Sequence, residues 1–121
     1  KSPNIFYDTS NNFEPYFLDW QYVAFGKGVQ DLIFFLIESF SIDDIILLLP
    51  IFKNYYYINI TKTIRTYTYE QYENDLFDSF CYFPFFVAVW FGSTNDDNLI
   101  DKNFPYFFIQ KFIKLVTVLK K

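Results

Sequence analysis

Histidine and methionine are absent from the 121-residue sequence, which has only one cysteine and three glycines. Without histidine, the chain can build neither a Ser-His-Asp nor a Cys-His catalytic arrangement, nor a histidine-based zinc site. The single cysteine, Cys81, cannot form an internal disulfide, which fits a reducing compartment. Any chemistry must therefore rest on carboxylates, amides, hydroxyls or a bound metal.

Basic residues are also scarce: ten Lys and Arg stand against fourteen Asp and Glu, for a net charge of −4. A nucleic-acid surface normally needs clustered basic side chains, so no nucleic-acid partner is expected. The one basic cluster is typical of a solvated helix face that also complements the helix dipole, and it comprises Lys111, Lys114, Lys120 and Lys121.

Long uninterrupted apolar runs are missing as well. The stretches 32–52 and 79–95 are apolar, but charges break the first, and the second carries Pro84, Gly92 and a polar tail. Neither offers the roughly 20 apolar residues that a spanning helix needs. We therefore expect no membrane partner and, since no signal-peptide pattern is visible, a cytoplasmic location.

Aromatic residues are abundant, at 26% of the chain, with 18 Phe and 11 Tyr. The length suits one domain or one lobe with a thick aromatic core. A genomic preference for AT-rich codons is an alternative source of this bias. Because no methionine stands at position 1, we expect a processed product or a fragment.

The first twenty residues predict a β-hairpin. Residues 5–7 and 13–18 are rich in strand-forming residues, and the turn formers of residues 8–12 separate them. Pro15 suggests an edge position or a strand start.

From Val29 the apolar residues recur with the period of a helix. Ser41 with Asp44 resembles a capping box and predicts a second helix over 42–63, which Pro50 would kink or split. The sequence thus predicts an α+β, mostly helical fold, in which four or five helices follow the hairpin.

Thr68 with Gln71 predicts another helix, which Pro84 would interrupt and Gly92 would end. Asn103 can cap a last helix, with Pro105 in its first turn.

Two side chains that can bind metal stand at the ends of the predicted hairpin. Asn4 precedes the first strand and Asp19 follows the second, so the hairpin should bring them together despite their separation in sequence. Mg²⁺ prefers oxygen ligands and often takes only one or two from protein side chains. On spacing alone, the favoured alternative is that Asn4 and Asp19 are turn and cap residues.

Three stretches resemble the kinase-like small-molecule phosphotransferases: residues 1–7 (KSPNIFY), 16–21 (YFLDWQ) and 26–32 (GKGVQDL). That superfamily includes aminoglycoside phosphotransferases, choline kinases and ecdysteroid-kinase-like proteins. Its pattern is an HGDxxxxN loop, a hairpin, an (I/L)DW or (I/L)DFQ segment and a G-x-G-x-x-D-L helix start. The LDWQ and GKGVQDL segments are most similar to the ecdysteroid-kinase-like branch.

This resemblance implies a lobe of a protein-kinase-like fold and assigns roles to single residues. Asn4 would match a Mg²⁺ ligand of the catalytic loop, and Asp19 would match the aspartate that bridges Mg²⁺ to the phosphates of ATP. Asp31 would brace the catalytic loop, although an acidic residue in a first helical turn is also favourable for the helix dipole alone. Gly26 and Gly28 would allow a tight approach from strand to helix.

The same comparison implies that the site is incomplete in this sequence. The expected catalytic Asp would lie five positions before Asn4, ahead of Lys1, and the nucleotide-binding N-lobe would precede it. We therefore expect residues 1–121 to form a partial domain, with a metal-site hairpin over 1–21 and a helical subdomain over 29–121.

The expected activity is that of the intact protein: transfer of the γ-phosphoryl group of ATP to a hydroxyl of a small molecule. This chain alone would be inactive. Trp20, Tyr22 and Trp90 are conceivable substrate-lining residues, with core packing the alternative for Trp90. A non-enzymatic helical binding module and a degenerate pseudokinase are the rival interpretations.

Overall fold

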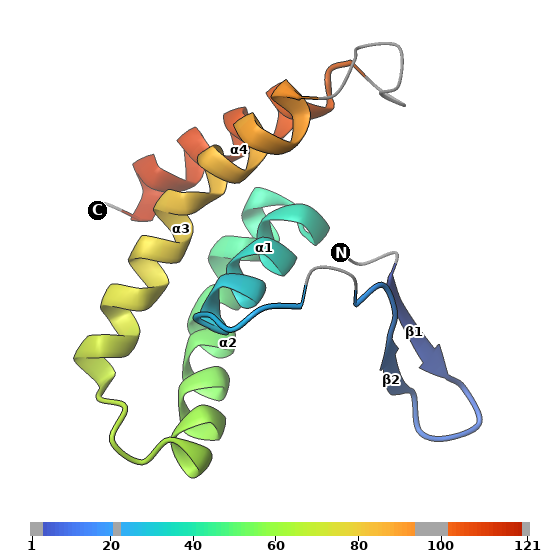
Figure 1. Ribbon diagram of the computed structural model, residues 1–121, viewed down its shortest axis with the longest axis vertical. Helices are drawn as coiled ribbons and strands as arrows, with labels where there is room; N and C mark the ends of the chain where they lie inside the picture. The colour runs from blue at the N-terminus through green and yellow to red at the C-terminus, as the bar shows by residue number, and fades with distance from the viewer. Residues whose placement is uncertain (1–3, 21–22, 94–101, 120–121) are drawn as a thin grey trace.

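A computed structural model describes residues 4–20, 23–93 and 102–119, which form a two-stranded antiparallel hairpin followed by four helices (Figure 1). This confirms the expected α+β, mostly helical class. The elements in chain order are β1 (Ile5–Asp8), β2 (Glu14–Phe17), α1 (Val29–Ser39), α2 (Ile42–Thr63), α3 (Tyr69–Gly92) and α4 (Phe104–Leu119).

Side-chain caps fix the starts of α2 and α3, as the sequence predicts. The Ser41 hydroxyl accepts a hydrogen bond from the Asp44 amide at 3.2 Å. Thr68 and Gln71 form a complete capping box, in which each side chain accepts from the other residue's backbone amide. Each cap satisfies amides that lack partners in the first turn of a helix.

The two internal prolines do not split their helices. α2 continues through Pro50 and α3 continues through Pro84, so the expected interruption at Pro84 is wrong. Proline removes one backbone hydrogen bond and crowds the preceding turn, at a cost of about 3 kcal/mol. In α3, buried Phe80, Phe83 and Val87 flank Pro84, and their packing offsets that cost. Figure 1 shows the two halves of α3 running in different directions.

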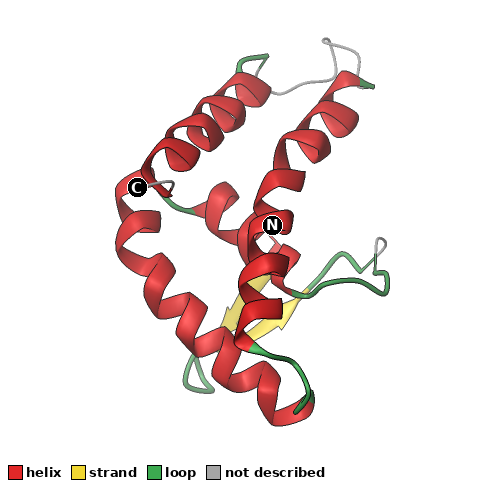
Figure 2. Ribbon diagram, turned by 90° about the vertical axis from the view of Figure 1, so that its left-hand side faces the viewer, coloured by secondary structure: helices red, strands yellow, loops and turns green. Residues whose placement is uncertain are grey.

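The core lies where the helices meet, and α1 is at its centre. α1 packs along α3 and also contacts α2 and α4, while α3 and α4 lie side by side (Figure 2). The stripe of α1 that the sequence predicts to be apolar is buried at Val29, Ile33, Leu36 and Ile37. Facing aromatic residues complete the core, including Tyr72, Phe83 and Phe108.

Lys111 contradicts the expectation of a solvated basic face on the last helix. Its side chain is only 5% exposed, and its ammonium donates a hydrogen bond to the Ile37 carbonyl of α1. Lys114, one turn further on, is exposed as expected, whereas Lys120 and Lys121 lie outside the described residues. The buried position arises because Lys111 and Phe108 share the face of α4 that packs on α1.

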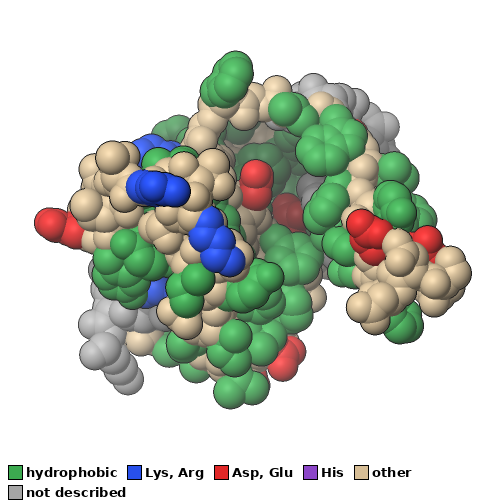
Figure 3. All heavy atoms as spheres, turned by 90° about the horizontal axis from the view of Figure 1, so that it is seen from below, with side chains coloured by type: hydrophobic (Ala, Val, Ile, Leu, Met, Phe, Trp, Pro, Cys, Tyr) green, Lys and Arg blue, Asp and Glu red, His purple; other side chains and the backbone are tan. Residues whose placement is uncertain are grey.

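The hairpin stands to one side of the helices, and neither strand packs extensively against them (Figure 1). Its aromatic side chains are therefore exposed, among them Phe6, Tyr16 and Phe17. Seen from below, Lys and Arg side chains gather over the helices, whereas the hairpin carries acidic and hydrophobic ones (Figure 3). Within the part of the chain that the structure describes, no helix is long and apolar enough to cross a membrane.

Candidate functional site

The hairpin owes its shape to the polar turn between its strands. The Asp8 carboxylate accepts hydrogen bonds from both the amide and the hydroxyl of Ser10, at 2.8 and 2.6 Å. These two bonds hold the pKa of Asp8 below its usual value. Asn12 and Phe13 then adopt positive φ angles of 51° and 57°, which reverse the chain direction. The turn thereby sets the register that pairs Asp8 with Glu14 and Ile5 with Phe17.

At the open end of the hairpin, Asn4 and Asp19 meet as the sequence predicts. The strand pairing extends one step further, because the Leu18 amide donates to the Asn4 carbonyl at 2.9 Å. Asn4 Nδ2 then donates to Asp19 Oδ2 at 3.0 Å, across fifteen positions of sequence. Both side chains lie at the surface, so a ligand can reach the pair.

The backbone at Asp19 is held in an uncommon conformation. Its φ of 66° lies in the left-handed region, which aspartate tolerates better than most residues but which still costs energy. Immediately afterwards, the Trp20 indole donates to the Phe17 carbonyl at 2.9 Å and packs edge-on against the Phe17 ring. The turn at Asp19 directs its carboxylate back towards Asn4.

This pair offers two oxygen-bearing side chains of the kind that Mg²⁺ prefers. Asp19 supplies a carboxylate, and Asn4 supplies a side-chain amide. The Asn4 amide nitrogen faces Asp19, and rotation about the Cβ–Cγ bond of Asn4 would place the amide oxygen there instead. Two protein oxygens match the usual demand of Mg²⁺, which fills its other positions with phosphate and water. Among the described residues, no group of three or more His, Cys, Asp and Glu could hold a metal alone. A metal bound at this pair would need further ligands from elsewhere.

The GKGVQDL segment anchors the start of α1 to α2 and α3. A Cβ on Gly28 would lie 2.6 Å from the Tyr56 hydroxyl of α2, whereas one on Gly26 would meet nothing within 4 Å. The Lys27 ammonium forms an ion pair with Asp75 of α3 at 3.0 Å. Gly28 thus lies against a side chain of α2, whereas the resemblance implies a tight approach from strand to helix at both glycines, which remains a prediction.

Asp31 lies in the first turn of α1, close to this anchor. Burial, and then the carboxylates of Asp31 and Asp75, raise the pKa of Tyr56. Within the described part of the chain, the Asp31 carboxylate makes no hydrogen bond to the hairpin. The bracing role that the resemblance gives Asp31 concerns a loop ahead of Asn4 and remains a prediction.

The expected substrate-lining aromatics differ in their surroundings. Trp20 directly follows Asp19 in the sequence, and its side chain is 64% exposed. Trp90 stacks on Phe86 of the same helix but is 39% exposed, so it does not belong to the buried core. Tyr22 lies outside the described residues.

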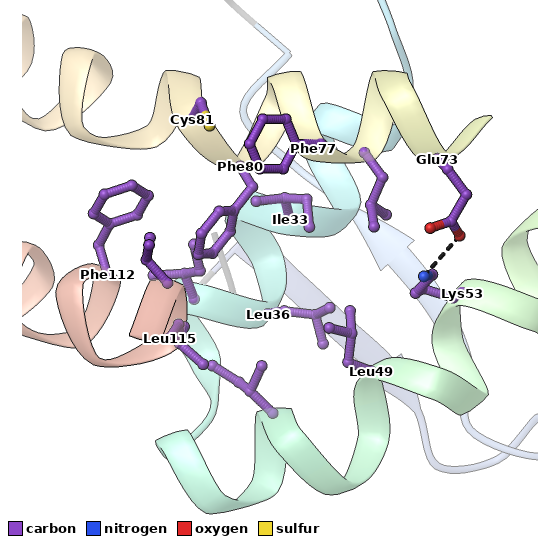
Figure 4. Close-up of a pocket in the computed structure, with 14 residues that line it drawn as sticks. Ile33, Leu36, Leu49, Lys53, Glu73, Phe77, Phe80, Cys81, Phe112 and Leu115 are labelled. Carbon is purple, nitrogen blue, oxygen red and sulfur yellow. Dashed lines mark ion pairs between the residues drawn. The ribbon is translucent and has the colours of Figure 1, made fainter. Parts of the chain in front are cut away.

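A second candidate site, which sequence reasoning missed, lies among the helices. The Lys53 ammonium of α2 and Glu73 of α3 are 2.7 Å apart at the edge of an apolar cavity (Figure 4). Burial works to raise the pKa of Glu73, but the nearby Lys53 ammonium and Tyr69 hydroxyl hold it below its usual value. Twenty positions separate Lys53 from Glu73, so no local spacing rule could have paired them.

Comparison of the chain with protein-family models, with curated proteins and with solved structures finds no match.

Proposed function

We propose that the open end of the hairpin is half of a Mg²⁺–nucleotide site in an ATP-dependent phosphotransferase that acts on a hydroxyl of a small molecule. The observation that carries this proposal is the 3.0 Å contact between Asn4 and Asp19. It joins the two residues that the kinase-like resemblance assigns to Mg²⁺, and the left-handed turn at Asp19 supports it. A cytoplasmic location, where ATP is abundant, is part of the same proposal.

In this proposal the chain contributes to the reaction by holding the Mg²⁺ charge beside the phosphates. Asp19 and Asn4 would hold Mg²⁺, which neutralises phosphate charge as the phosphoryl group moves. Gly28 and Lys27 would fix the start of α1 behind the hairpin through Tyr56 and Asp75. The base that orients the acceptor hydroxyl would come from an aspartate ahead of Lys1, and the clamp on ATP from an N-lobe.

The second candidate function is a non-enzymatic helical binding module, or a pseudokinase that has kept the fold without the reaction. The exposed aromatic residues on both faces of the hairpin favour it, because large exposed apolar surface commonly marks a protein interface. They include Phe6, Tyr7, Phe13, Tyr16 and Phe17. The two candidates differ in whether Asp19 binds a metal.

The test is metal and nucleotide binding at the hairpin. Mn²⁺ is a paramagnetic substitute for Mg²⁺, and with ADP it should broaden the NMR signals of Asn4 and Asp19 before those of other residues. Asp19→Asn should weaken the binding by about tenfold or more, since a charged ligand to the metal is lost. Glu14→Gln is the matched control, because Glu14 is an exposed carboxylate at the opposite end of the hairpin. It should bind as the unaltered chain does.

A protein extended upstream of Lys1 permits the stronger version of this test. Its Mg²⁺-dependent binding of ATP should be lost in Asp19→Ala and retained in Glu14→Gln. Nucleotide binding that is insensitive to Asp19 would overturn the kinase assignment and favour the binding module.

A further inference from the structure

The helices line an apolar cavity of about 360 Å³ that is partly open to solvent, lies away from the hairpin and does not depend on the function proposed for it. All four helices contribute to its wall, through residues that include Leu36, Leu49, Phe80 and Leu115 (Figure 4). Ligand pockets between the helices of bundles typically measure about 300–1,000 Å³. The cavity therefore has the size and place of a small-molecule site.

One end of this cavity is polar, and the rest is hydrocarbon. The polar end is the Lys53–Glu73 ion pair, whose charges cancel. Glu73 Oε1 is buried, and within the described residues it accepts no hydrogen bond of good geometry, although the Lys53 ammonium lies 2.7 Å away. The two side chains are 24% and 38% exposed, and both line the cavity, so a ligand inside it meets the ion pair.

We propose that the cavity binds a small uncharged amphiphile, with an alkyl or aromatic body against the helices and one hydroxyl at the Lys53–Glu73 pair. A hydroxyl can donate to Glu73 and accept from Lys53 at once, which leaves the ion pair intact. A charged head group would instead compete with one member of this partly exposed pair and weaken the attraction between Lys53 and Glu73.

The volume limits the size of this ligand. An apolar cavity of about 150 Å³ binds benzene. The cavity here is more than twice as large. An alcohol with a body of about eight carbons therefore matches its volume better than a single ring does.

Cys81 supplies a direct reporter of occupancy. It is the only cysteine of the chain, it lines the cavity, and its side chain is exposed to reagents. A ligand in the cavity should slow the reaction of Cys81 with a disulfide reagent such as Ellman's reagent. At about ten times its dissociation constant, a ligand fills about 90% of the cavities, so the slowing of this exposed thiol should be close to its maximum.

The first experiment compares three probes of equal chain length on the unaltered protein: 1-octanol, octanoate and octylammonium. We expect 1-octanol to protect Cys81 and to raise the melting temperature, while octanoate and octylammonium do so only at much higher concentrations. This comparison needs no variant, so it cannot fail through misfolding.

The second experiment inverts the preference for the head group. Glu73→Gln leaves the Lys53 cation unpaired, so octanoate should become the best of the three probes. Lys53→Gln should favour octylammonium for the same reason. Lys62→Gln is the matched control, since Lys62 is on the same helix and exposed, contacts Asn59 and does not line the cavity. It should keep the preference for 1-octanol.

Two results would overturn the proposal. If none of the three probes slows Cys81 labelling or shifts the melting temperature, the cavity is not a binding site for such molecules. If octanoate or octylammonium protects the unaltered chain as well as 1-octanol does, the assignment of a neutral head group to the ion pair is wrong.

Discussion

Lys111 is the one charged side chain among the described residues that is almost fully buried. Its ammonium donates to the carbonyl of Ile37, in the last turn of α1, where carbonyls lack the amide of a following turn. The helix C-terminus carries a partial negative charge that favours a cation. The Phe107 ring, 5.4 Å from the ammonium, adds a cation–π contact. Lys111 therefore joins α4 to the end of α1.

We predict that Lys111→Met lowers the free energy of unfolding by about 1–3 kcal/mol, because it leaves the buried Ile37 carbonyl without a donor. Lys114→Met is the control on the exposed face of the same helix, and it should change the free energy by less than about 0.5 kcal/mol. Urea unfolding followed by circular dichroism measures both. Equal effects of the two substitutions would show that the bond to Ile37 contributes no stability.

Asp19 and Lys53 show why single residues differ in how well the sequence predicts their roles. Asp19 and Asn4 meet because a hairpin joins them, and the turn formers and strand formers of residues 5–18 are visible locally. Lys53 meets Glu73 only because α2 and α3 pack together, which no local pattern specifies. The positive φ of Asp19 is equally hidden, since aspartate occurs in many backbone conformations.

At the scale of elements, the helices were the most predictable part. A period of 3.6 residues marks α1, and capping residues mark the starts of α2 and α3, because both signals are local. Pro84 misled the prediction because local propensity opposes a helix there, while the buried aromatic residues on both sides stabilise one. The prediction for Lys111 was wrong for a related reason. Its burial is decided by its neighbours on α4 and not by its charge.

The hairpin is an element with little support from the rest of the chain. Its strands pair with each other, and its side chains are mostly exposed. An isolated two-stranded hairpin is at best marginally stable in water. Its order therefore depends on the hydrogen bonds of the Asp8 turn and on the Asn4–Asp19 bond.

We predict that amide hydrogens of β1 and β2 exchange at least about 100-fold faster than those in the middle of α1 and α3, because hairpin opening does not disturb the core. Hydrogen exchange followed by NMR measures each amide, and the middle of α1 is the internal reference. Protection of the hairpin equal to that of α1 would mean that the two parts unfold together, contrary to their separate packing.

At the scale of the molecule, tyrosines hold the lower ends of α2 and α3 together. The Tyr72 hydroxyl donates to the Lys53 carbonyl at 3.1 Å, and the Tyr67 hydroxyl donates to Asp75 at 2.5 Å. The rings of Tyr56 and Tyr57 pack on Tyr72. Because Asp75 also pairs with Lys27, this cluster links the start of α1 to both long helices.

The tyrosine cluster should make the whole fold sensitive to alkaline pH. The pKa values of Tyr56, Tyr67 and Tyr72 are raised in the folded chain. Burial is the main cause, and neighbouring carboxylates add to it. In the unfolded chain these hydroxyls ionise near pH 10. Above that pH the unfolded state binds fewer protons than the folded state, so stability falls as pH rises.

We therefore predict a lower free energy of unfolding at pH 11 than at pH 9. At still higher pH, the helical circular dichroism signal should be lost cooperatively. The absorbance of the last tyrosines to ionise should rise over the same pH range. Tyr72→Phe should flatten this dependence, because one of the late-titrating hydroxyls is gone. Tyr55→Phe is the control on an exposed ring of α2, and it should leave the dependence unchanged. If all tyrosines ionised together near pH 10 while the helices stayed intact, the hydroxyls of the cluster would not be held protonated by the fold, and its role in joining the helices would rest on ring packing alone.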